Sequence, residues 1–256
     1  MELFAAGLSM GALALAMAIA LFAGLVKGAL GFAMPMIMIS ALSGFMPVEL
    51  ALAGLIMPTL VTNLSQAFRQ GAAAALGSMR KFWRMITATV VFLIISAQAV
   101  PHISQTLMLG LLGTPIVAFA TVQLLNVPLR IRLERRHRAE WALGVVSGLY
   151  GGISGVWGPP LLIYLLSVGT EMREMIRVQG VVFLIGAITL LGAHAQSGVL
   201  NARSLPFSVA LVLPAMAGLM LGYLIQDRLD ATRFRRWTLI LLMLTGLNLL
   251  RRAAMG

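Results

Sequence analysis

The chain has 256 residues, of which 60% are hydrophobic and 11% are charged, and its mean hydropathy is +0.95. Apolar stretches of about 20 residues, enough to cross a hydrocarbon layer of about 30 Å, exclude a soluble domain and predict an all-α polytopic membrane protein. The net charge of +11 does not indicate nucleic-acid binding, because the basic residues gather between the apolar stretches, where they are typical of cytoplasmic loops.

Nine apolar segments follow one another with short connectors, which predicts one membrane domain without a soluble module. They cover residues 5–27, 29–45, 49–68, 83–100, 105–127, 141–168 (broken near 151–159), 176–194, 206–225 and 237–250. The charged stretch 130–140 contains five arginines and divides the chain. We therefore expect a first membrane repeat at 1–129, a basic cytoplasmic linker at 130–140 and a second membrane repeat at 141–256.

The two halves share a pattern of glycines followed by proline at a spacing of 124 positions. The matching pairs are Gly24 and Gly148, Gly28 and Gly152, Gly31 and Gly155, and Pro35 and Pro159. Glycine and proline both disfavour the interior of a helix. The pattern predicts two repeats of about four helical segments each, with broken or re-entrant helices at Gly24–Pro35 and Gly148–Pro160. Breaks at corresponding places in two halves are typical of the binding site of a secondary transporter.

The distribution of arginine and lysine predicts the orientation of the loops. Loops 69–84 and 130–138 are rich in basic residues and are expected in the cytoplasm. Loops 45–48 and 101–104 contain neither lysine nor arginine and are expected outside.

The same rule favours inverted halves. Segment 227–236 contains four arginines, and it reaches the cytoplasmic side only if the broken segment 141–168 enters the membrane and returns. Each half would then hold a re-entrant pair and three spans, and an odd number of crossings inverts the second half. One observation opposes this arrangement, because Arg251 and Arg252 would then lie outside.

The order of the spans, the glycine-rich break and proline of each half, and Asn63 followed by Phe68-Arg69-Gln70-Gly71 resemble the TauE/SafE family over nearly the whole chain. The resemblance implies a multi-pass protein of a bacterial inner membrane that exports sulfite or an organosulfonate, or a related anion permease. The chain departs from its own repeat at the first break, where Lys27 and Ala33 stand in place of Gly151 and Trp157.

We expect the breaks to form the substrate site. The N-terminus of a half-helix presents N–H donors and a partial positive charge that suit an oxyanion. Pro35 and Pro159 stand where such half-helices could begin, since proline is tolerated in the first turn. The glycines expected at the site are Gly28, Gly31, Gly152, Gly155 and Gly158. The alternative is that these glycines only allow close packing of helices.

Four further side chains are candidates for binding. Lys27 is a cation inside an apolar segment, where a charge is costly and indicates function, although it could instead extend to an interface. Asn63 and Gln179 each follow a break by one span, whereas other polar residues such as Gln66 are assigned to contacts between helices. Trp157 lies within the second break and could line the site or belong to an interfacial belt.

Residue types that the sequence lacks restrict the class of substrate and the possible cofactors. The sequence has no Asp or Glu in the middle of an apolar segment, which favours an anionic or neutral substrate over a cation. His194 and His102 are the remaining titratable candidates near the spans. The sequence contains no cysteine and no motif for a metal or a nucleotide, so neither a metal nor another cofactor is expected.

The function is therefore predicted to be secondary transport of a small anion by alternating access between the two repeats, without enzymatic activity. The partners are the lipid bilayer and the anion; coupling to a proton or another ion and assembly into a homo-oligomer are left open. One alternative is an anion channel or a membrane assembly partner that transports nothing. Another is an intramembrane serine protease of the rhomboid type, because Gly152-Ile153-Ser154-Gly155 precedes His194 by one span.

Overall fold

The computed structural model describes residues 6–125, 127, 136–225 and 231–255, and these residues form helices without strands. The helices are α2 (Met10–Leu30), α3 (Met34–Leu42), α4 (Val48–Phe68), α5 (Ala72–Lys81), α6 (Trp83–Ala97), η1 (Val100–His102), α7 (Gln105–Leu124), α8 (Arg136–Ser154), α9 (Gly158–Ser167), α10 (Met172–Gln196), α11 (Ser204–Ala210), α12 (Val212–Ile225) and α13 (Ala231–Met255).

Seven helical stretches among the described residues are long and apolar enough to cross a membrane. They are 10–30, 48–68, 83–102, 105–124, 174–196, 204–225 and 233–255. The predicted all-α polytopic membrane protein is confirmed.

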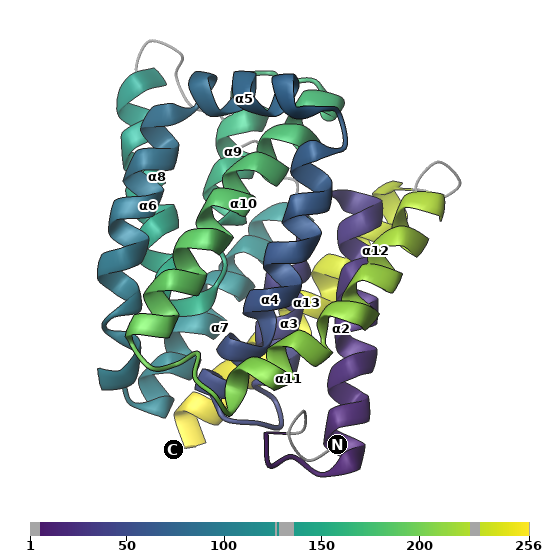
Figure 1. Ribbon diagram of the computed structural model, residues 1–256, viewed down its shortest axis with the longest axis vertical. Helices are drawn as coiled ribbons and strands as arrows, with labels where there is room; N and C mark the ends of the chain where they lie inside the picture. Colours follow the sequence, from purple (N-terminus) through teal and green to yellow (C-terminus); the bar gives the residue numbers. More distant parts are fainter. Residues whose placement is uncertain (1–5, 126, 128–135, 226–230, 256) are drawn as a thin grey trace.

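The molecule has two distinct ends (Figure 1). Helix α5 lies across one end, which we call the α5 end, and the start of α2 and the end of α13 lie at the other. The α5 end carries the described part of loop 69–84 and the first turns of α8 and α10, because Arg84 pairs with Glu140 and Lys81 pairs with Glu174. Helices α2 and α8 therefore start at opposite ends and run in opposite directions.

The breaks lie within the predicted ranges, at their C-terminal parts. Helix α2 ends at Leu30 and α3 begins at Met34, and α8 ends at Ser154 and α9 begins at Gly158. The two breaks are thus 124 positions apart. Gly31 and Gly155 have φ angles of +83° and +70°, which glycine adopts without a steric cost.

The expected boundary between the first two apolar segments, at residues 27–29, was wrong. Gly24 and Gly28 remain helical, because hydrocarbon offers no water to replace the hydrogen bonds of a broken helix. Pro35 occupies the first turn of α3, and Pro159 and Pro160 occupy the first turn of α9, as expected from the missing N–H of proline.

The first-half glycines bring α2 and α12 together. A Cβ added at Gly24 would collide with the carbonyl oxygen of Ala215, and one added at Gly28 would lie 2.8 Å from the Cα of Gly222. Gly218 and Gly222 meet the backbone of α2 in the same way. Small residues four positions apart on both helices allow this close contact, which is typical of membrane helices.

Helix α8 makes the corresponding contact with α6. Gly144, Gly148 and Gly152 have no room for a side chain against the backbone of α6. The hydroxyl of Thr89 donates to the carbonyl oxygen of Gly144 at 3.3 Å, and that of Ser96 donates to the carbonyl oxygen of Gly148 at 3.1 Å. The helix before each break thus packs on a helix from the other half of the sequence.

The predicted linker is partly helical. Arg130, Arg132 and Arg135 lie outside the described residues, but α8 begins at Arg136. Glu140, at the end of the predicted linker, is only 1% exposed. It accepts a hydrogen bond from the hydroxyl of Tyr164 at 2.6 Å and pairs with Arg84 and Arg136. A buried carboxylate is stabilised by such partners, and here they join α6, α8 and α9.

We predict that Gly24→Ala lowers the free energy of unfolding by about 1–3 kcal/mol, because the added methyl group must displace the backbone of α12. Gly11→Ala is the matched control on the same helix, since nothing lies within 4 Å of a Cβ at that position. Thermal melting of the purified variants in detergent measures both effects. Equal melting temperatures for the two variants would contradict the close contact of α2 and α12.

Candidate functional site

The side chain of Lys27 lies inside the protein, one turn before the first break. It is 1% exposed, and its ammonium group donates to the hydroxyl of Thr62 at 2.9 Å and to the amide oxygen of Asn63. The amide nitrogen of Asn63 in turn donates to the carbonyl oxygen of Phe183 at 3.0 Å. Helices α2, α4 and α10 therefore meet at Lys27, and this lysine does not extend to an interface.

A second polar layer lies at the break itself. The amide nitrogen of Gln66 donates to the carbonyl oxygens of Gly31 and Ile176, both at 3.0 Å. The amide oxygen of Gln179 lies 3.4 Å from the position that a Cβ of Gly31 would occupy. This layer therefore joins the same three helices as the Lys27 layer.

The two layers are separated by about one helical turn. Lys27 precedes Gly31 by four residues, and Asn63 precedes Gln66 by three, so both pairs lie on one face of their helix. Gln179 and Phe183 are likewise four residues apart on α10. One turn of helix corresponds to about 5 Å along its axis.

The ammonium group of Lys27 has no acidic partner among the residues that the structure describes. Within the described part of the chain, the ion pairs join Lys81 to Glu174 and join Arg84, Arg136 and His137 to Glu140. Lys27 pairs with none of the described acidic residues. Neutral oxygens of Thr62 and Asn63 satisfy two of its three N–H donors. The site is therefore suited chemically to an anion.

The second break is built differently. Position 151, which is 124 residues after Lys27, is glycine, and position 186, the same distance after Thr62, is also glycine. The side chain of Trp157 fills the space between them, lying 3.1 Å from a Cβ at Gly151 and 2.9 Å from one at Gly186. Trp157 is 2% exposed, and its ring meets that of Phe183 edge to face at 6.3 Å.

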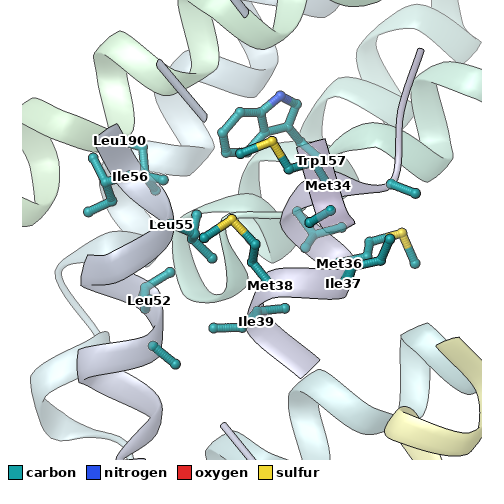
Figure 2. Packing of buried hydrophobic residues seen from close by; sticks show 14 of the residues in the cluster. Met34, Met36, Ile37, Met38, Ile39, Leu52, Leu55, Ile56, Trp157 and Leu190 are labelled. Atoms are coloured by element: carbon teal, nitrogen blue, oxygen red, sulfur yellow. The ribbon is translucent and has the colours of Figure 1, made fainter. Parts of the chain in front are cut away.

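Figure 2 shows the apolar surroundings of these breaks. The indole of Trp157 lies beside Met34 of α3, and Met38 of α3 lies beside Leu55 of α4. Leu190 of α10 belongs to the same cluster of buried residues. The indole therefore belongs to the hydrophobic core, and the belt of aromatic residues at the membrane surface does not include it. At the positions of Lys27 and Thr62 the second half has Gly151 and Gly186, and the indole of Trp157 fills the space beside them.

The N-termini of the two half-helices offer few donors. Gly158 is followed by Pro159 and Pro160, so two of the first three residues of α9 have no N–H group. Gly155 lies against the side chain of Leu55, and Gly158 lies against the ring of Phe183. In α3, Pro35 likewise removes one donor.

The structure thus brings together part of the predicted site. Lys27, Gly31, Asn63 and Gln179 gather at the first break, with Pro35 at the start of α3. Gly28 and Gly152 lie at the contacts of α2 with α12 and of α8 with α6. Trp157, Gly155, Gly158 and Pro159 surround the second break.

Two residues of the site were missed. Thr62 and Gln66 were not selected, although both lie on the face of α4 that carries Asn63. Gln66 lies three residues after Asn63, a spacing that places both on one face of α4 and could have indicated it. No spacing of this kind indicated Thr62.

The serine and histidine considered for a protease have other partners. The hydroxyl of Ser154 donates to the carbonyl oxygen of Tyr150 at 2.7 Å. The Nε2 atom of His194 lies 2.9 Å from the carbonyl oxygen of Gly152, and Nδ1 lies 3.3 Å from the hydroxyl of Ser197. An activated serine needs a hydrogen bond to its base. The described contacts of Ser154 and His194 do not include one.

Comparison with known proteins assigns the chain to a family, and the matched range includes both breaks. The model of the family described as sulfite exporter TauE/SafE matches residues 16–249, which is nearly the whole chain. No curated protein and no solved structure matches the chain. The family is one of membrane transporters and not of enzymes, and the seven apolar helices agree with this assignment. The chain belongs to the TauE/SafE sulfite exporter family, and it is a multi-pass membrane protein.

Proposed function

We propose that this protein is a secondary transporter that carries a small anion, sulfite or an organosulfonate, across the inner membrane of a bacterium. The observation that carries the proposal is Lys27, a buried cation at a break between helices that pairs with none of the described acidic residues. The family supports export of sulfite or a related anion.

The energetics of Lys27 favour an anionic ligand. A buried charge costs several kcal/mol unless hydrogen bonds and an opposite charge compensate it. Thr62 and Asn63 supply neutral oxygens only. An anion beside the ammonium group would supply the missing charge, so binding at this place is expected to be stronger than at an exposed lysine.

Basic side chains at the α5 end support the same substrate. Arg177 lies two residues before Gln179, and its guanidinium donates to Gln70 at 2.7 Å and to Ser78 at 3.1 Å. The guanidinium of Arg69 lies 4.0 Å from the ring centroid of Tyr223. Along α4 and α10, Arg69 and Arg177 lie nearer to the α5 end than Gln66 and Gln179 do. Clustered charges of one sign raise the local concentration of the opposite ion.

The arrangement of helices supports alternating access. Helix α2 packs on α12 and α8 packs on α6, so the helix before each break contacts a helix of the other half. Helices α4 and α10 start 124 positions apart and pack against each other at the Lys27 layer. Inverted repeats that move against each other around such a contact open a site to the two sides in turn.

We predict that Lys27→Met reduces uptake of sulfite into proteoliposomes by at least about tenfold. Methionine keeps much of the volume of the lysine chain but cannot attract an anion, and tenfold corresponds to the loss of about 1.4 kcal/mol. Lys27→Arg keeps the charge and is expected to retain more activity than Lys27→Met.

The matched control is Lys81→Met, which removes the second lysine of the sequence. Lys81 is exposed and pairs with Glu174 at 2.5 Å, outside the site. Normal uptake by a folded Lys27→Met variant would remove Lys27 from the transport site. Currents that show no saturation with sulfite concentration would instead favour a channel.

We predict that Trp157→Ala lowers the free energy of unfolding by about 3–5 kcal/mol, because it leaves a cavity between Gly151 and Gly186. Trp237→Ala is the matched control, since Trp237 is 69% exposed and its loss is expected to have little effect. Thermal melting followed by size-exclusion chromatography distinguishes the two variants. A Trp157→Ala protein as stable as the control would show that the indole does not support the second break.

A further inference from the structure

The layer at the first break contains buried hydrogen-bond acceptors that lack donors. The amide oxygens of Gln66 and Gln179 are both buried and accept no hydrogen bond from any described group. Each side chain is 2% exposed. Leaving a buried acceptor unpaired is unfavourable, and native structures usually provide a partner for it.

The orientation of Gln66 is fixed by its neighbours. Both hydrogens of its amide nitrogen are used, because it donates to the carbonyl oxygens of Gly31 and Ile176. Rotation of the amide by half a turn would place its oxygen against these two oxygens. The Gln66 oxygen therefore points away from these two carbonyl groups, and no described donor reaches it.

The two layers have opposite requirements. The Lys27 layer has a surplus of positive charge, whereas the layer of Gln66 and Gln179 has a surplus of acceptors. Gly31 adds no side chain to the second layer. Its φ of +83° is sterically unfavourable for residues other than glycine. A ligand with an acidic group at one end and a donor about 5 Å away would satisfy both layers.

We propose that the site selects small anions that carry their own N–H or O–H donor, with Lys27 binding the acidic group and the amide oxygens of Gln66 and Gln179 accepting from the donor. This inference rests on the proposed function, because it assumes that anions bind at Lys27. The ligand class is a short sulfonate, or a similar acid, with an amino or hydroxyl group. A neutral acceptor can serve either donor, so both groups belong to the same class.

The test compares three ligands that share one acidic group. They are ethanesulfonate, which has no donor, 2-hydroxyethanesulfonate and 2-aminoethanesulfonate. Binding to the purified full chain is measured by isothermal titration calorimetry or by the shift in melting temperature with ligand concentration. We expect at least one donor-bearing ligand to bind about tenfold more tightly than ethanesulfonate. The hydroxyl and amino ligands show separately which donor the amide oxygens prefer.

A ratio below fivefold for both donor-bearing ligands, with ethanesulfonate bound, would overturn this inference and leave the proposed function standing. Absence of binding by all three, and by sulfite, would overturn the proposed function and this inference together. The comparison uses the unmodified protein, so it does not depend on a variant that folds.

A variant tests the assignment to Gln179. Gln179→Leu removes one of the two free acceptors and is expected to reduce the ratio between donor-bearing and donor-free ligands at least threefold. Gln179→Met, with an unbranched chain, is the second variant if leucine prevents folding. Gln123→Leu is the matched control, because Gln123 contacts Arg235 between α7 and α13, away from the site. An unchanged ratio in a folded Gln179 variant would contradict the assignment.

Discussion

The ammonium group of Lys27 imposes the strongest constraint on this fold, because a charged side chain inside a membrane bundle is costly unless polar groups pair with it. Its partners come from α4, and the amide of Asn63 extends the contact to the backbone of α10. Lys27 thereby determines which faces of α2, α4 and α10 meet. The break that follows at Gly31 is held to the same two helices by Gln66. Charge, break and helix contact form one unit.

Glycine has two separate roles in this unit. Gly24 and Gly28 allow the backbone of α12 to approach α2, which fixes the position of the helix that carries Lys27. Gly31 instead ends that helix with a positive φ and lets Gln66, Ile176 and Gln179 approach the break closely. In the second half, Gly151 and Gly186 provide the space that Trp157 fills. The glycine and proline pattern of the two halves is therefore combined with different buried side chains, Lys27 near the first break and Trp157 near the second.

The apolar stretches were sufficient to predict a polytopic helical protein, and the glycine and proline pattern indicated the regions of the two breaks, because a membrane permits few arrangements of a chain with unpaired backbone groups. The exact end of α2 was not predicted, since Gly24 and Gly28 remain helical. Lys27 and Asn63 could be selected because charge and amide groups are rare in such segments. The contacts were not predictable: burial of Glu140 depends on Arg84 and Tyr164, which are far from it in the sequence. The role of Gln66 could not be distinguished in the sequence from that of other polar residues between helices. Its oxygen is unpaired because the carbonyl groups of Gly31 and Ile176 fix the orientation of its amide, and these contacts appear only in the fold.

The most direct test of an anion site at Lys27 is a crystal structure of the protein with selenite, a sulfite analogue whose selenium atom can be located by anomalous scattering. A selenium peak within about 4 Å of the Lys27 ammonium nitrogen, absent from crystals of the Lys27→Met variant, is the predicted result. A peak confined to the arginines of the α5 end, with none beside Lys27, would contradict the assignment of the first break as the binding site.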